Sequence, residues 1–511
     1  MWLSYHRQAY GFSPRIYNKM LYISYIHSLT TDCATMDYMN EKERKQYEKL
    51  ILTPIPKLVS SLAIPTVISM MITMIYNLVD AYFVGKLGTS ASGSIGILLG
   101  VQAIFQAMGF MCGHGSGTII SMKLGTGNTK SANRFATLAF ITGSVLSITF
   151  ATIGLIFIAP MLRLLGSTET ILPYAIHYGF YILLCGPALT LSCILNNIMR
   201  YEGRAFYAMI GLVSGGVLNM IGDPILMFHF GLGIDGAGLS TCVSQYISLG
   251  ILGFMFLSGK TISRIRLSSL AGEGVTPSLL LGNIGHILKN GTPSLVRQVL
   301  NAVASMALNI SANPFGDSTI AAMAITGRII MFIASMMVGI GQGFQPVASY
   351  NYGAKKYARI RQSYRFTLAF GMSILCALAV IVYFQAGPLI GLFRRDPEVI
   401  AIGTRALRFQ CLSIVLQPIS IVTNMLFQSI GKSRIASFTA SLRTGLYFLP
   451  AIIILPIFMG ITGVESAQAI ADAMASFTCI PLAIHFFHTI PKKNQESLMD
   501  QKYNRFIASA R

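Results

Sequence analysis

Long apolar stretches alternate with short polar connections along most of the chain. From residue 57 onward there are twelve apolar stretches, each at least about 18 residues long and so able to cross a hydrocarbon core of about 30 Å as an α-helix. We expect membrane-spanning helices at residues 58–83, 93–122, 134–158, 171–199, 205–229, 235–258, 284–312, 319–349, 364–386, 399–429, 435–459 and 462–488. The pattern therefore predicts an all-α polytopic membrane protein.

The composition excludes several other classes of protein. Apolar residues make up 53% of the chain and charged residues only 11%, whereas an average soluble domain has roughly 25% charged residues. The eight cysteines form no CxxC pair and the eight histidines no HExxH motif. We therefore expect neither a disulfide scaffold nor a metal centre, and we expect no cofactor.

The basic residues indicate how the helices are oriented. The chain has 38 Lys and Arg against 18 Asp and Glu, a net charge of +20. Such a charge suggests nucleic acid in a soluble chain, but here it lies mostly in loops, where it keeps them in the cytoplasm. Seventeen Lys and Arg, Arg443 among them, fall on the side of both termini and six on the opposite side. We expect cytoplasmic termini, a plasma or inner membrane location and no nucleic-acid partner.

The polar segment 259–283 divides the apolar region into two halves that repeat. One shift of 228 residues aligns Pro65 with Pro293 and Asn196 with Asn424. The same shift aligns Gly88 with Gly316, Gly113 and Gly115 with Gly341 and Gly343, Gly125 with Gly353, Pro160 with Pro388, and Gly203 with Gly431. Because six is even, the two halves share one orientation, related by an axis along the membrane normal. We predict homologous six-helix lobes at 57–258 and 284–488, a cytoplasmic linker at 259–283 and cytoplasmic tails at 1–56 and 489–511.

The N-terminal tail does not resemble a signal peptide, because charged residues interrupt every apolar run in it. Met36 and Met39 stand just before the charged run at 41–49. Residues 1–35 are therefore either an over-extended translation start or an amphipathic surface tail.

Three acidic residues stand out inside the predicted spans: Asp80, Asp223 and Asp472. A carboxylate at a helix centre costs roughly 2.5–3.5 kcal/mol on insertion scales, so each is a functional candidate. The structural alternative for Asp80 and Asp223 is an interhelical hydrogen bond. For Asp472 the structural alternative is an ion pair with Arg297 or Arg328.

Helical spacing places a hydroxyl and a phenol beside Asp80. Thr73, Tyr76 and Asp80 stand at i, i+3 and i+7, so they share one helix face. Under the repeat shift Asp80 aligns with Leu308. The predicted chemistry is therefore asymmetric, with the acids in the N-terminal lobe.

A second polar cluster is predicted in the fifth span. Asn219 precedes Asp223 by one helical turn, and Pro224 then removes a backbone donor. Freed carbonyls beside a carboxylate are typical of the broken helices that bind coupling ions in transporters. We expect hinges at Pro224 and at Pro65 in the first span. The repeat carries Pro450 in place of Asp223, after a one-residue slip.

The C-terminal lobe offers a different set of polar groups. Arg297, Gln298 and Asn424 are its candidates for lining a substrate cavity. In the N-terminal lobe, His114 within CGHGSG is either a proton relay or a hydrogen-bonded structural histidine.

These features resemble the multidrug and toxic compound extrusion (MATE) family over roughly residues 57–488. The matching segments are NLVDAYFVG, GKLGTSA, NNIMRYEG, NMIGDP and GAGLST. The resemblance implies twelve helices in two bundles and the export of cationic, amphipathic compounds, driven by inward cation flux.

The resemblance also implies a cation site in the N-terminal lobe. Carried over residue by residue, it comprises Asp80, Asn196, Asn219, Asp223 and Thr241, with Tyr76 nearby. The sodium-type branch adds a Glu in helix 7 and an Asp in helix 10, where this chain has Arg297, Gln298 and Asn424. Proton coupling is therefore favoured, with sodium at Asp80 and Asp223 as the alternative.

The sequence thus predicts a monomeric, proton-coupled antiporter, not an enzyme, that exports drugs or toxic organic cations and so confers resistance. Deprotonated Asp80 and Asp223 would attract the substrate, and protonation from outside would release it. A flippase for lipid-linked oligosaccharides, with Arg297 and Arg328 in a basic cavity, is the nearest alternative. An intramembrane aspartyl protease is disfavoured because Tyr76 is four residues from Asp80 and MIGDP lacks the first glycine of GxGD. A passive channel is the remaining alternative, which concentrative transport would exclude.

Overall fold

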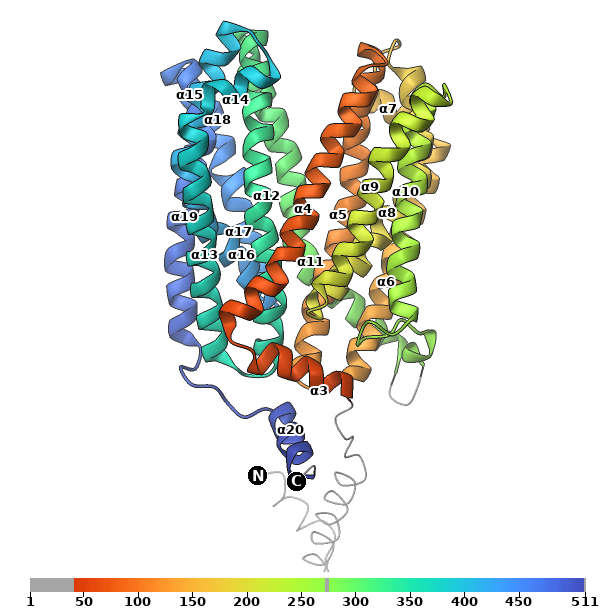
Figure 1. Ribbon diagram of the computed structural model, residues 1–511, viewed down its shortest axis with the longest axis vertical. Coiled ribbons are helices and arrows are strands. Elements are labelled where there is room, and N and C mark those ends of the chain that lie inside the picture. Colours follow the sequence, from red (N-terminus) through yellow and green to blue (C-terminus); the bar gives the residue numbers. More distant parts are fainter. Residues whose placement is uncertain (1–40, 272–274, 510–511) are drawn as a thin grey trace, which may run out of the picture. The chain divides into compact units, whose positions relative to one another are not determined.

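A computed structural model describes residues 41–271 and 275–509 of the chain (Figure 1). The question of the translation start concerns residues 1–35 and lies outside the described residues. The described chain divides into a small unit, residues 41–45 with 500–509, and a large unit, residues 46–499. The small unit contains parts of α3 (Glu41–Tyr47) and α20 (Leu498–Ser509). The helices that follow belong to the large unit.

The large unit consists of helices, and no residue of its described part is in a β-strand. The first half contains η1 (Glu48–Leu52), α4 (Ile55–Gly85), α5 (Thr89–Gly125), α6 (Thr129–Ile156), α7 (Ile158–Leu164), α8 (Leu172–Tyr201), α9 (Ala205–Pro224), η2 (Ile225–His229) and α10 (Gly233–Leu257). After η3 (Leu267–Leu270), the second half contains α11 (Pro277–Ala312), η4 (Asn313–Phe315), α12 (Asp317–Gly353), α13 (Tyr357–Phe384), α14 (Ala386–Phe393), α15 (Pro397–Ile414), α16 (Gln417–Ser429), α17 (Ser433–Ser441), η5 (Leu442–Leu446), α18 (Phe448–Met459) and α19 (Ile461–Thr489).

The helices reproduce the predicted twelve-span layout. Ten described helices or helix runs are long and apolar enough to cross a membrane, and α15 with α16 forms an eleventh, bent span. The twelfth is α11, which has 36 residues. Its polar side chains, among them Lys289, Arg297 and Gln298, keep it below the same hydropathy criterion.

Several of the predicted spans are not continuous α-helices. The span predicted at 399–429 bends by 53° between α15 and α16. Pro418 stands in the first turn of α16 and has no amide proton to continue α15. The span predicted at 435–459 contains the π-helix η5, which holds Arg443. Arg443 therefore lies inside a span, and its assignment to a cytoplasmic loop was wrong.

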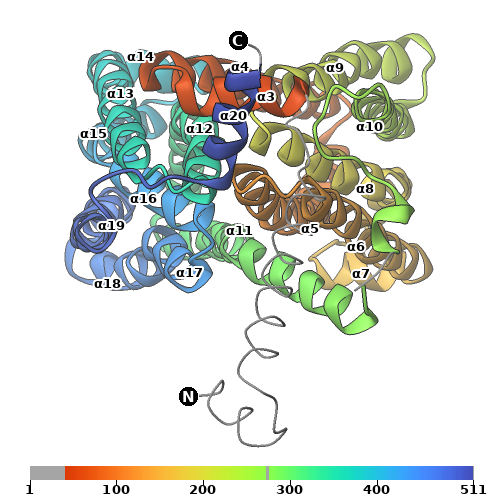
Figure 2. The same cartoon turned by 90° about the horizontal axis from the view of Figure 1, so that it is seen from below.

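The helices of the large unit form two bundles, with α4–α10 in the first lobe and α11–α19 in the second (Figures 1 and 2). The end-on view shows α4 and α11 on opposite edges of the boundary between the lobes. Each lobe has an apolar core of its own; Phe105 and Tyr178 are buried in the first, and Phe344 and Phe427 in the second. The first helix of each lobe also packs on the opposite lobe.

Glycines at positions related by the repeat allow the first helix of each lobe to pack closely on the opposite lobe. A Cβ atom on Gly115 of α5 would lie 2.0 Å from the carbonyl oxygen of Ile287 on α11, and one on Gly343 of α12 would lie 2.6 Å from the Cα of Ala63 on α4. Gly115 and Gly343 are 228 residues apart in the sequence. Backbones from opposite lobes therefore touch at two equivalent places.

Replacing Gly115 by alanine is expected to destabilise this packing by about 1–3 kcal/mol, the usual cost of overpacking a dense contact. The matched control is Gly100→Ala on the same helix, where a Cβ would meet no atom within 4 Å. Thermal unfolding of the purified protein in detergent would compare them. Equal melting temperatures for the two variants would contradict the close approach.

A buried hydrogen-bond network joins the lobes near the same contacts. Arg200 of α8, 2% exposed, donates to Gln342 Oε1 on α12 at 2.5 Å and lies 2.9 Å from His114 Nε2. His114 Nδ1 lies 2.7 Å from the hydroxyl of Ser294 on α11, which in turn accepts from Gln428. His114 thus has the contacts of a hydrogen-bonded structural histidine. The repeat shift relates His114 to Gln342 and Arg200 to Gln428.

The segment between the lobes is fixed to the turn that follows α8. The buried carboxylate of Glu202 accepts hydrogen bonds from the amides of Ile262 (2.8 Å) and Ser263 (2.9 Å) and from the Ser263 hydroxyl. Burial raises the pKa of Glu202, although these hydrogen bonds oppose the shift. We call the end of the large unit where Glu202 contacts Ile262 and Ser263 the linker end.

Candidate functional site

A pocket of about 130 Å³ lies within the first lobe, between α4, α5, α8, α9 and α10. Four of the predicted site residues line it: Tyr76, Asp80, Asn219 and Thr241. Three glutamines that the sequence reasoning did not select also line it: Gln102, Gln106 and Gln245. The pocket therefore combines a carboxylate with amide and hydroxyl groups on an otherwise apolar wall.

The amide of Asn219 organises the polar side of the pocket. Its Nδ2 lies 3.1 Å from Asp223 Oδ1, 3.2 Å from Thr241 Oγ1 and 3.4 Å from Ser240 Oγ. The Ser240 hydroxyl in turn donates to the main-chain carbonyl of Asn219 at 3.2 Å. The predicted i, i+4 pair on α9 is thus joined to α10.

Each of the two acids keeps one oxygen free. Asp80 Oδ1 and Asp223 Oδ2 are buried, and neither has a hydrogen-bond partner among the described residues. Buried polar atoms without a partner are rare in native proteins and point to a missing proton, ion or water. Oxygen atoms from two carboxylates and a hydroxyl suit either a proton or a hard cation. The described residues contain no cluster of three or more His, Cys, Asp or Glu for a transition metal.

Tyr178 of α8 lies beside Asp80, and the sequence reasoning missed it. Its side chain is 1% exposed, and its hydroxyl lies beside Asp80 and Thr241 and near Asp223. No local signal identified Tyr178 among 22 tyrosines, because its role depends on how α8 packs against α10 in the folded lobe.

Two predicted asparagines lie outside this pocket. Asn196 donates to the carbonyl of Ala208 at 2.7 Å, and Asn424 donates to the carbonyl of Ala436 at 2.6 Å. All four positions obey the 228-residue repeat. Each asparagine thus ties two consecutive helices together in its own lobe.

The other predicted cavity residues are more dispersed. Thr73 donates to the carbonyl of Ser69 at 2.8 Å within α4 and does not line the pocket. Gln298 lies at the pocket margin, because its amide donates to Gln106 Oε1 across the lobe boundary at 3.3 Å. Arg297 lies near Arg200 and Tyr201, at the interlobe network.

The two predicted hinges differ in structure. Helix α4 is continuous across Pro65, whose carbonyl accepts from the Ser69 hydroxyl at 2.8 Å. Helix α9 ends at Pro224, and the chain continues as the π-helix η2. Asp223 therefore stands where the helical hydrogen-bond pattern changes.

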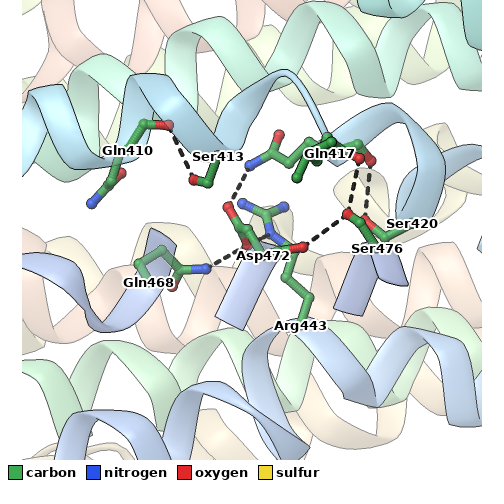
Figure 3. Close-up of polar contacts among 9 residues, drawn as sticks. Gln410, Ser413, Gln417, Ser420, Arg443, Gln468, Asp472 and Ser476 are labelled. Atoms are coloured by element: carbon green, nitrogen blue, oxygen red, sulfur yellow. Dashed lines mark hydrogen bonds and ion pairs between the residues drawn. The ribbon is translucent and has the colours of Figure 1, made fainter. Parts of the chain in front are cut away.

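Asp472 pairs with Arg443, and the predicted ion pair with Arg297 or Arg328 is wrong (Figure 3). Asp472 Oδ1 accepts from Arg443 Nε at 2.7 Å and from Gln468 at 2.8 Å, and Oδ2 accepts from Gln417 at 3.0 Å. These groups come from the first turn of α16, from η5 and from the middle of α19. Arg328, by contrast, is exposed on α12.

A second acid of the C-terminal lobe was overlooked in the sequence. Glu465 lies inside the span predicted at 462–488 and is fully buried. It accepts from Arg405 at 2.8 Å. Both buried acids of α19 therefore have an arginine partner, whereas Asp80 and Asp223 have none among the described residues.

Comparison with known proteins supports the same architecture. The MatE family profile matches residues 65–225 and 293–482. The multidrug export protein MepA of Staphylococcus saprophyticus subsp. saprophyticus is 26% identical over 419 residues, which are 82% of this chain and 91% of that protein. MepA of Staphylococcus aureus is 26% identical over 446 residues, 86% of this chain and 96% of that protein.

Solved structures of transporters share the fold. A mutant of the Vibrio cholerae MATE transporter VcmN has a TM-score of 0.79 at 23% identity and covers 85% of this chain and 97% of its own. An outward-facing multidrug resistance MATE family transporter of the MOP superfamily has a TM-score of 0.81 at 23% identity, over 86% of this chain and 98% of its own. These likenesses confirm the predicted arrangement of two helical bundles.

Proposed function

Because the chain belongs to the MatE family, we propose that it is a proton-coupled antiporter that exports cationic, amphipathic compounds by alternating access. The observation that carries this proposal is the pair of carboxylates of Asp80 and Asp223, each with one buried oxygen that lacks a hydrogen-bond partner among the described residues. The names of the MepA relatives, multidrug export proteins, support the substrate class.

The geometry supports an exchange of proton and substrate at one site. With the carboxyls ionised, the pocket beside Tyr76 and Asn219 favours a cation. Protonation of Asp80 and Asp223 neutralises both carboxyls and so removes the attraction for that cation. One proton moving through 100 mV provides roughly 2.3 kcal/mol for this work. Sodium is the alternative coupling ion, because the same oxygens suit it.

The charge distribution supports an orientation with the linker end in the cytoplasm. The excess of Lys and Arg in loops on that side remains after Arg443 is removed from the count. In this orientation the contacts at Gly115 and Gly343 and the Arg200 network close the cytoplasmic side. We propose a monomer in the plasma or inner membrane with this topology.

A flippase for anionic lipid-linked sugars is less well supported. Such a substrate requires a basic cavity, but Arg328 is exposed and Arg297 does not line the pocket. The pocket instead contains the carboxylate of Asp80. The positions of the charges favour a cationic substrate.

Proton-driven export is testable with purified protein in liposomes. Loaded with a fluorescent cation such as ethidium, vesicles that contain the protein should move the dye against its gradient when a pH gradient is imposed, and protein-free vesicles should not. A sodium gradient at equal pH on both sides tests the alternative coupling ion, because it should drive dye movement only if sodium is coupled. Movement that only dissipates the dye gradient, whatever ion gradient is applied, would overturn the antiporter and indicate a channel.

A further inference from the structure

An open groove lies on the outside of the large unit, well away from the pocket of the first lobe. Its volume is about 460 Å³, and it is lined by Pro56, Ala358, Arg361, Gln362, Arg365 and Phe366. Pro56 belongs to the first turn of α4, and the other residues belong to the first three turns of α13. Both helices start at the linker end, so the groove lies where these spans enter the membrane.

The charge in the groove is uniformly positive. Arg361 and Arg365 stand at i and i+4, on one face of α13, and the lining contains no acidic residue. Arg361 is held in place because it donates to the carbonyl of Phe487 at 2.9 Å. The exposed guanidinium of Arg365 has no hydrogen-bond or ionic partner among the described residues.

Apolar side chains are exposed or stacked further along both helices. Two and three turns beyond Pro56, α4 exposes Ile64 (57%) and Ile68 (40%). On α13 the rings of Phe366 and Phe370 stack with their centroids 5.6 Å apart. A charged recess at the membrane boundary is thus followed by apolar surface towards the membrane interior.

We propose that this groove binds the headgroup of an anionic phospholipid. The lipid phosphate would contact Arg361 and Arg365, the Gln362 amide would bind headgroup oxygens, and the acyl chains would follow the apolar surface. Basic recesses between spans on the cytoplasmic side are suited to such headgroups. This inference requires the membrane topology but not the identity of the coupling ion.

The position of the groove gives the lipid a mechanical role. The segment before α4 is already tied to α13, because Arg359 donates to the carbonyl of Thr53 at 2.7 Å. A headgroup bound to Arg365 would also pack against Pro56 of the first lobe's α4, which carries Asp80, and so add a contact between the lobes. Anionic lipid is therefore expected to stabilise this arrangement of the lobes.

The test measures thermal unfolding of the full-length protein in detergent, titrated with phosphatidylglycerol or phosphatidylcholine. Phosphatidylglycerol should raise the melting temperature of the wild type more than phosphatidylcholine does. Arg365→Gln should raise the phosphatidylglycerol concentration at half-maximal effect at least fivefold. Its melting temperature without lipid should stay unchanged, because Arg365 has no hydrogen-bond or ionic partner among the described residues. The matched control is Arg394→Gln, an exposed arginine after α14 at the opposite end of α13.

Three results would overturn the proposal. The first is an equal response to the two lipids, and the second is an equal loss of response in Arg394→Gln and Arg365→Gln. The third is full competition by soluble glycerol phosphate, which would assign the groove to free phosphate. Native mass spectrometry of the lipid-bound protein provides an independent measurement, since the count of retained phosphatidylglycerol molecules should fall by one in Arg365→Gln.

Discussion

Asp80→Asn and Asp223→Asn are each expected to lower proton-driven dye accumulation in liposomes at least about tenfold. Each substitution keeps the size of the side chain but removes a carboxyl that can exchange a proton. Losing one coupled proton removes roughly 2.3 kcal/mol per 100 mV, and about 1.4 kcal/mol already corresponds to a factor of ten. Passive dye binding at neutral pH should also weaken, because the pocket loses negative charge.

The matched control for these variants is Asp235→Asn. Asp235 lies in the same lobe, at the start of α10, but it is half-buried and its partner is His177 at 3.2 Å. Its replacement should leave transport and its pH dependence unchanged. Undiminished, pH-dependent transport in both Asp80→Asn and Asp223→Asn would contradict the site, provided that thermal unfolding shows both variants to be folded.

Much of this site could be predicted because its members are related by helical spacing or by local motifs. Asn219 and Asp223 are one turn apart, and Tyr76 and Asp80 share one side of α4. The structure brings Tyr76, Asp80, Asn219 and Thr241 to one pocket, with Asp223 bonded to Asn219 behind it. The two lobes were predictable for a similar reason, since a repeat with a constant shift can be recognised in the sequence without knowing how the helices pack.

The parts that could not be predicted depend on contacts between distant segments. Tyr178 reaches Asp80 from α8, and no spacing rule relates the two positions. The partner of Asp472 is Arg443, 29 residues earlier in the sequence and on a different helix. The π-helix that contains Arg443 has no sequence signature. Arg443 was therefore assigned to a loop, because the sequence did not show that Asp472 is its partner within the membrane span.

Arg443→Met is expected to destabilise the C-terminal lobe by about 3–5 kcal/mol, the usual cost of leaving one member of a buried ion pair without its partner. Asp472 is 2% exposed, and loss of the guanidinium leaves its charge with only the amides of Gln417 and Gln468. Thermal unfolding in detergent measures the change. Arg434→Met, an exposed arginine on α17, is the matched control and should unfold like the wild type.

The double variant Arg443→Met with Asp472→Asn distinguishes two causes of the lost stability. One is the loss of the arginine itself, and the other is the uncompensated charge left on Asp472. Asparagine at 472 is neutral and can still accept from Gln417 or Gln468, so most of the lost stability should return. If the double variant is as unstable as Arg443→Met, the packing of the arginine and not the charge of Asp472 determines stability. Recovery would instead show that Arg443 neutralises the charge of Asp472. Asp80 and Asp223, which lack such a partner among the described residues, would then be the acids left to exchange a proton.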